Sequence, residues 1–132
     1  MTRCGSGDLS ACTSIKDCFR ECIKLLSIDW AQVDVSLVTS LSNFIRQCVV
    51  LNDINVTDWD VGSLTFMDAM AVNCYALEVF DMSKWVTGTI MGINSAFQAC
   101  NSLGDVDLSG IQVTSAYTGY MNFVFYRCYA MR

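Results

Sequence analysis

The sequence contains no proline and no histidine among its 132 residues. Histidine is the most frequent general acid or base in enzymes and a common metal ligand, so its absence removes the usual routes to catalysis. The chain also has no glycine-rich phosphate loop and no serine or cysteine beside a credible base. The lack of proline suits a continuous hydrogen-bonded ladder, because each strand then keeps all of its N–H donors. We therefore expect a protein that is not an enzyme.

Long apolar runs are also missing, although 53% of the residues are hydrophobic. No run approaches the ~18 residues of a membrane-spanning helix, and residues 1–12 lack the apolar segment of a signal peptide. The eight Lys and Arg residues are scattered in a chain of net charge −5, so no basic stripe for phosphates is present. These features predict one domain with a substantial core, no membrane span and no nucleic-acid partner.

What the chain does contain is a repeating unit, seen most clearly in residues 67–82, MDAMAVNCYALEVFDM. Four of its residues between Met67 and Cys74 have the i, i+3, i+4, i+7 spacing of one helix face. Phe80 and Met82 then alternate with a period of two, which is typical of a strand. Each unit is therefore predicted to be one short helix, one turn and one strand.

The position of one cysteine marks the repeat along the chain. It recurs after 26, 26, 26 and finally 28 residues, at Cys22, Cys48, Cys74, Cys100 and Cys128. Repeats of this length indicate stacked structural units. We predict units at residues 14–38, 39–64, 65–90 and 91–116, followed by a half unit at 117–132. Residues 1–13 are expected to form an N-terminal cap or degenerate strand, and a loose polar tail is the alternative.

Residues 93–111, INSAFQACNSLGDVDLSGI, carry the motif most completely, and Asp81–Trp85 and Asn55–Trp59 carry its DLSxW variant. The motif resembles the BspA-like leucine-rich repeat of mycoplasma-type surface lipoproteins, over residues 14–132. The resemblance implies an α/β solenoid, a right-handed leucine-rich-repeat stack of about four and a half helix-turn-strand units with one parallel sheet. It also implies a non-enzymatic adhesion or interaction protein of an extracellular, cell or virion surface. Ile45 and Ala71 depart from the Phe that is usual in the motif.

Eight cysteines in a short chain are typical of a disulfide scaffold. The five at the repeated position instead favour a stacked, reduced ladder in the core, because a thiol behaves there as a small hydrophobe. Neighbours in such a stack lie ~5 Å apart, within reach of a disulfide, so oxidation stays an alternative. A Cys4–Cys12 or Cys12–Cys18 bridge also stays open. With no histidine and no C-x-x-C pair, we expect no metal site and no cofactor.

Polar residues recur seven positions after the cysteines and are expected to point outward from the strands. This candidate ligand face comprises Asp29, Asn55, Asp81 and Asp107, together with Thr57, Ser83 and Ser109 from the next outward column. It is either a calcium- or sugar-binding row or a solvated surface without a ligand. The longer connection at residues 113–121 adds Tyr117 and Tyr120, since insertions in repeat proteins often form binding loops. Trp59 and Trp85 share a repeat position with aliphatic residues, which favours core packing over a sugar platform.

The two ends of the repeat suggest how the protein acts. The half unit carries an apolar layer with no strand after it: Met121, Val124, Phe125, Cys128 and Met131. The other end carries Leu9, Ile15, Cys18 and Phe19. A head-to-tail contact that does not close makes a filament, and burial of these layers would drive it at about 25 cal/mol per Å². The first hypothesis is a structural protein that self-associates into a fibre.

The second hypothesis is a monomeric adhesion or ligand-binding module. It would use the outward strand face or the 113–121 loop to bind a host or surface protein or a glycan. The sequence leaves both functions open.

Overall fold

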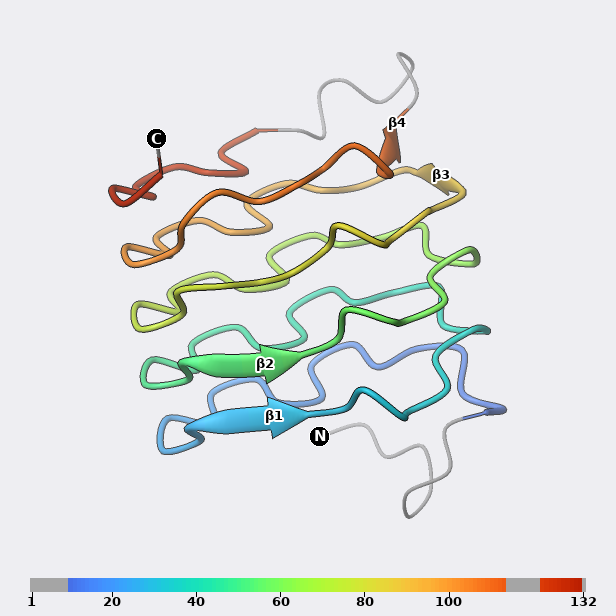
Figure 1. The fold of residues 1–132 in the computed structure, drawn as a ribbon, viewed down its shortest axis with the longest axis horizontal. Coiled ribbons are helices and arrows are strands. Elements are labelled where there is room, and N and C mark those ends of the chain that lie inside the picture. Colours follow the sequence, from blue (N-terminus) through green and yellow to red (C-terminus); the bar gives the residue numbers. More distant parts are fainter. Residues whose placement is uncertain (1–9, 114–121, 132) are drawn as a thin grey trace.

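The chain winds into successive coils that lie on top of one another in a stack, as the computed structural model shows (Figure 1). The structure describes residues 10–113 and 122–131. Parallel backbone bridges join Ser14 to Ser40, Ser40 to Phe66 and Phe66 to Gly92, each 26 residues further along the chain. Equivalent residues of successive coils therefore lie side by side.

Four short strands occur in the described residues: β1 (Ser27–Asp29), β2 (Asp53–Asn55), β3 (Thr89–Ile90) and β4 (Gln112–Val113). β1 pairs in parallel with β2, and β3 pairs in parallel with β4, in two separate sheets. In β1 and β2 the central isoleucine is buried and its two neighbours are exposed. Figure 1 shows that β1 and β2 belong to coils near the N-terminal end of the stack, and β3 and β4 to coils further along it.

The predicted helix-turn-strand architecture is wrong, because the described residues contain no helix and two small sheets replace the single parallel sheet. The segments predicted as helices are chains of turns in which two residues, four positions apart, have positive φ. These pairs are Asp17 and Glu21, Asn43 and Gln47, Ala69 and Asn73, Ser95 and Ala99, and Phe123 and Arg127. A left-handed residue at every fourth position interrupts a right-handed helix, so the helix-turn-strand unit predicted from the sequence does not form.

The hydrogen bonds explain why these segments still show a helix-like spacing. The N–H groups of Phe19 and Glu21 donate to the carbonyls of Phe44 and Arg46 in the next coil, at 2.9 and 2.8 Å. The intervening N–H of Arg20 donates back to Asp17, three residues earlier, at 3.2 Å. A succession of such turns places residues three and four positions apart on the same side, as a helix would.

The core runs through the middle of the stack and includes the fully buried Phe44, Ile45, Phe80 and Phe97. Trp59 and Trp85 are buried in it, with stacked rings 6.0 Å apart. Their indole N–H groups donate to the backbone carbonyls of Trp30 (2.8 Å) and Val56 (2.9 Å), each 29 residues earlier. The tryptophan pair therefore joins coils within the core.

The positive φ of Ala69, 54°, gives a test of this backbone. An alanine in the left-handed region is strained by ~1 kcal/mol, whereas glycine is not. We expect Ala69→Gly to raise the free energy of unfolding measured by urea denaturation.

The matched control is Ala71→Gly, two residues further along at a buried position without positive φ. There the added backbone freedom should lower stability by ~1 kcal/mol. Equal losses in the two variants would contradict the turn geometry described here.

Candidate functional site

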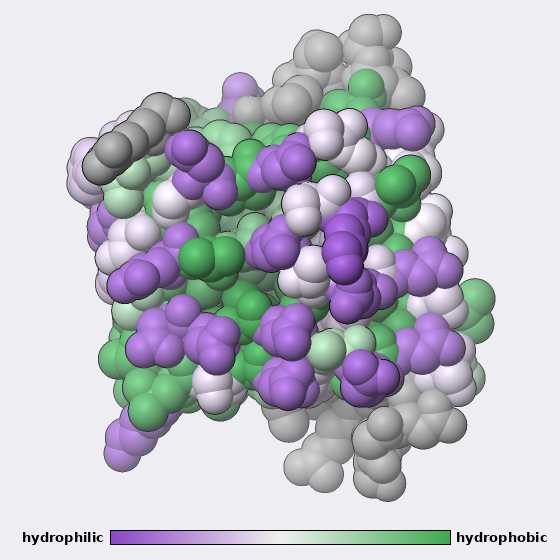
Figure 2. Space-filling model, in the orientation of Figure 1, coloured by the Kyte–Doolittle hydropathy of each residue, from purple (hydrophilic) through white to green (hydrophobic). Residues whose placement is uncertain are grey.

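Polar side chains gather across the coils on the face that carries β1 and β2 (Figure 2). Asp29, Asn55 and Asp107 are exposed there, and Asp81 is partly exposed. The Oδ1 atoms of Asp81 and Asp107 accept the backbone N–H groups of Ser83 and Ser109, both at 2.9 Å. These bonds form Asx turns at the ends of the extended segments. Two carboxylates of the candidate ligand face therefore have a structural use.

The same bonds affect the ionisation of this face. Hydrogen bonding from the side chain and backbone of Ser83 holds the pKa of Asp81 below its usual value, and Thr57 and Lys84 add to this effect. Ser109 lowers the pKa of Asp107 in the same way. Both carboxylates therefore keep their charge at a lower pH than an ordinary aspartate does.

Neighbouring coils are also joined by side chains on this face. The Thr57 hydroxyl donates to Asp81 Oδ2 at 3.3 Å, and Lys84 Nζ lies 2.9 Å from Asp58 Oδ1. Ser83 and Ser109 are exposed, and Thr57 is partly exposed. Within residues 10–113 and 122–131, no three Cys, Asp or Glu side chains come together as a group able to hold a metal ion.

A second set of turn-forming aspartates was missed by the sequence reasoning. Asp34 Oδ1 accepts the N–H of Ser36 at 2.9 Å, and Asp60 Oδ1 accepts that of Gly62 at 3.1 Å. The signal was present in the sequence as an aspartate followed two residues later by serine or glycine. Tyr117 and Tyr120 of the candidate ligand loop, and Leu9 and Met121 of the candidate end surfaces, lie outside the described residues.

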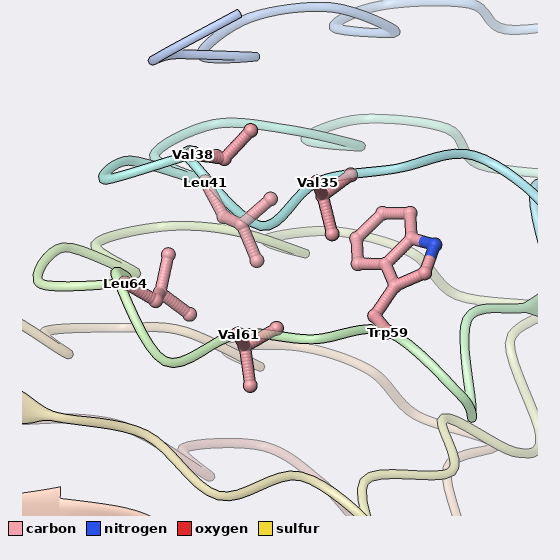
Figure 3. Close-up of a pocket in the computed structure, with 6 residues that line it drawn as sticks. All are labelled: Val35, Val38, Leu41, Trp59, Val61 and Leu64. Atoms are coloured by element: carbon pink, nitrogen blue, oxygen red, sulfur yellow. The ribbon is translucent and has the colours of Figure 1, made fainter. Parts of the chain in front are cut away.

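One apolar gap lies between two coils (Figure 3). Its lining residues are Val35, Val38, Leu41, Trp59, Val61 and Leu64. No space for even a water-sized molecule remains between their side chains, so the gap is part of the packed core. No helix in the described part of the chain is long and apolar enough to cross a membrane.

The five repeated cysteines form the cysteine ladder, in which all are free thiols. Four of them donate to a carbonyl of the preceding coil: Cys48 to Phe19 at 2.9 Å, and Cys74, Cys100 and Cys128 to Ile45, Ala71 and Phe97 at 3.0 Å. The three middle members are buried, whereas Cys22 and Cys128 are half-buried. The ladder thus joins successive coils by thiol hydrogen bonds.

The surroundings raise the pKa of three ladder thiols, those of Cys48, Cys74 and Cys128. Burial raises the pKa of Cys48 to about 11, and that of Cys128 also to about 11. Hydrogen bonding to Cys100, together with burial, raises the pKa of Cys74 far above its usual value. A protonated thiol is a donor and a poor nucleophile, which suits a structural role.

The cysteines near the N-terminus differ from the ladder. Cys12 is disulfide-bonded, whereas Cys18 is a half-buried free thiol. The Cys12–Cys18 bridge, one of the two that the sequence left open, is therefore not formed. Cys4, the other partner considered for Cys12, lies outside the described residues.

The C-terminal end of the stack presents backbone donors. Inside the stack, the N–H groups of Ser95, Phe97 and Ala99 donate to the last described coil, at 2.7–2.9 Å. The equivalent groups of that last coil are the N–H groups of Phe123, Phe125 and Arg127, and none of them donates to a described residue. This row is the donor edge.

The N-terminal end presents the complementary acceptors. In the second coil, the carbonyls of Ser42, Phe44 and Arg46 accept N–H groups from the first coil. The equivalent carbonyls of the first coil belong to Lys16, Cys18 and Arg20, and none accepts a backbone N–H from a described residue. This row is the acceptor edge, and Figure 1 places the first and last coils at opposite ends of the stack.

The side chains at the two ends are only partly covered. Val124, Phe125, Cys128 and Met131 are half-buried at one end, as are Cys18 and Phe19 at the other. Ile15, a candidate for the N-terminal end surface, is instead buried in the core, at 1% exposure. The sequence reasoning missed three exposed aromatic residues of the last coil, namely Phe123, Tyr126 and Tyr129.

A family model described as a mycoplasma protein of unknown function, DUF285, matches residues 8–132. No curated protein and no solved structure matches the chain.

The thiol ladder predicts a pH dependence of stability. The pKa of Cys48 rises from 9.0 to about 11 on folding, so the folded state holds more protons than the unfolded state between these values. This contribution to stability is present in full below pH 9 and is lost as the pH rises towards 11. We expect the urea midpoint of the wild-type protein to fall through this window.

The control is Cys48→Ser, which keeps a donor for the Phe19 carbonyl but does not titrate in this range. Its midpoint should fall less steeply between pH 9 and 11 than that of the wild type. Identical slopes would show that this thiol does not govern the alkaline response.

Proposed function

The chain belongs to the DUF285 family of mycoplasma proteins of unknown function, and we propose that it is a non-enzymatic structural protein of a cell or extracellular surface. In this proposal, copies associate head to tail through the ends of the coil stack. The observation that carries the proposal is the match between the donor edge and the acceptor edge.

The donor edge of one copy fits the acceptor edge of the next in the register already used inside the molecule. The N–H groups of Phe123, Phe125 and Arg127 would meet three carbonyls, as the N–H groups of each coil meet those of the coil after it. Unpaired backbone rows of this kind are templates for pairing with another chain. Because the two edges lie at opposite ends, the contact does not close on itself and extends into a chain of copies.

Side-chain burial adds to these hydrogen bonds. Inside the stack, the rings of Phe97 and Phe125 are stacked 5.7 Å apart, and Phe125 is half-buried because no described coil lies beyond it. Across the contact it would meet Phe19 of the next copy, which occupies the equivalent position in the first coil. Apolar surface covered there stabilises the contact by about 25 cal/mol per Å², against the cost of association.

Two further features support the proposed location and role. Cys12 is disulfide-bonded, and structural disulfides persist mainly in oxidising compartments such as the extracellular space. The BspA-like motif of residues 93–111 resembles that of bacterial surface proteins. The alternative, a monomeric adhesion module, has less support because Asp81 and Asp107 already accept N–H groups within their own turns.

A charge exchange across the contact tests the proposal. Residues 18, 44, 70, 96 and 124 occupy one column of the stack, so Val124 of one copy would face Cys18 of the next. We expect wild-type protein to form concentration-dependent oligomers in sedimentation velocity. Val124→Asp alone and Cys18→Lys alone should each be monomeric, because a charge would be buried against an apolar partner.

An equimolar mixture of these two variants should assemble again, since Asp then meets Lys at one contact and Val meets Cys at the other. Restored assembly also shows that both variants fold. The matched control is Val79→Lys, an exposed position on the side of the stack, which should assemble like the wild type. A wild-type protein that stays monomeric at every concentration would overturn the proposal.

A further inference from the structure

The cysteine ladder would continue across the proposed contact between copies. Inside the molecule Cys74 and Cys100 occupy equivalent positions one coil apart, close enough for Cys100 to raise the pKa of Cys74. If the next copy adds a coil in the same register, its Cys22 takes the place after Cys128. The terminal members of two ladders then become neighbours, as Cys74 and Cys100 are within one molecule.

We propose that the contact is a site of intermolecular disulfide formation, between Cys128 of one copy and Cys22 of the next. This inference rests on the proposed head-to-tail function. Adjacent parallel segments lie ~4.8 Å apart, which falls within the Cα separations that a disulfide spans. The bond would convert a reversible chain of copies into a covalent one.

Exposure selects this pair among the ladder cysteines. Cys48, Cys74 and Cys100 are fully buried, at 0% exposure, so an oxidant in solution does not reach them. Cys22 and Cys128 are half-buried free thiols at the two ends of the stack. Each copy therefore has one accessible ladder thiol for the copy before it and one for the copy after it.

The oxidant that the reaction needs is a small disulfide, such as oxidised glutathione. The Cys22 thiolate attacks one glutathione sulfur, which forms a mixed disulfide and releases one glutathione thiolate. The Cys128 thiolate of the neighbouring copy then attacks the Cys22 sulfur and releases the second glutathione. Two protein thiols lose two protons and two electrons, and one oxidised glutathione becomes two reduced ones. Because burial raises the pKa of Cys128 to about 11, the second step should speed up in mildly alkaline solution.

Cys18 is a competitor that the experiment must remove. It is a free, half-buried thiol whose pKa is raised by burial and by the nearby Cys22. In the proposed contact Cys18 faces Val124, so it has no thiol partner in the next copy. All variants are therefore made in a Cys18→Ser background.

The test treats the full chain with oxidised glutathione and separates the products on a non-reducing denaturing gel. We expect a ladder of dimers, trimers and larger species, with a Cys22–Cys128 peptide identified by mass spectrometry. Cys22→Ser and Cys128→Ser should each lose every band above the monomer. A mixture of these two variants should give dimers and nothing larger, because each copy keeps only one of the two terminal ladder thiols and can be linked to only one neighbour. Cys74→Ser, which changes a buried member of the cysteine ladder, is the control and should give the full series of oligomer bands.

Sedimentation in the presence of a reductant separates this inference from the function on which it rests. If the protein assembles under reducing conditions but gives no covalent oligomers after oxidation, the disulfide proposal is overturned and the head-to-tail contact stands. A protein that is monomeric when reduced and gives no covalent oligomers after oxidation would overturn both the disulfide and the head-to-tail contact. Links between two Cys22 residues would also overturn the inference, because they require the same ends to meet.

Discussion

The structure depends on backbone hydrogen bonds that leave one coil and end in the next. In the turn segments every second N–H is used in this way, from Phe19 to Phe44, from Ile45 to Met70, and from Phe97 to Val124. Buried N–H groups need partners, and a single coil contains no helix or hairpin that could supply them all. Each coil therefore relies on its neighbours, and the first and last described coils each pair with only one other described coil. The edges on which the proposed function depends follow directly from this way of satisfying the backbone.

The recurring side chains of the sequence serve the same purpose. Cysteine thiols donate to carbonyls of the preceding coil, and the indoles of Trp59 and Trp85 do so elsewhere in the coil. The hydroxyls of Thr39 and Thr65 also donate one coil back, to Thr13 and Thr39, at 3.0 and 3.1 Å. A carbonyl has two lone pairs, so one oxygen can accept a side-chain donor in addition to a backbone N–H. The sequence repeats because each coil has to offer the same donors and acceptors to the next.

The spacing of these residues could be read from the sequence, but their backbone conformation could not. Ser14, Ser40 and Phe66 are bridged at the same 26-residue interval that separates the first four ladder cysteines. The helix prediction failed because turns and helices both place residues three and four apart on one side. Positive φ at Asn43 and Asn73 has a weak sequence signal, whereas Ala69, Ala99 and Phe123 carry none. Phe80 and Met82 have the alternating pattern of a strand but do not lie in one. The donor and acceptor edges are formed by main-chain groups, so no side-chain pattern in the sequence predicts them.

The direction of the bonds in the turn segments has a consequence for symmetry. In an ordinary sheet, N–H groups of one strand point alternately to both sides, and their dipoles largely cancel. Here the N–H groups that link the turn segments, such as those of Asp17, Phe19 and Glu21, all point towards the C-terminal coil. Their dipoles add along the axis, which gives these segments a positive pole at the C-terminal end and a negative pole at the other, as peptide dipoles do in a helix. Two like poles repel, so a twofold dimer through these ends would be disfavoured, and all copies in the proposed row would face the same way.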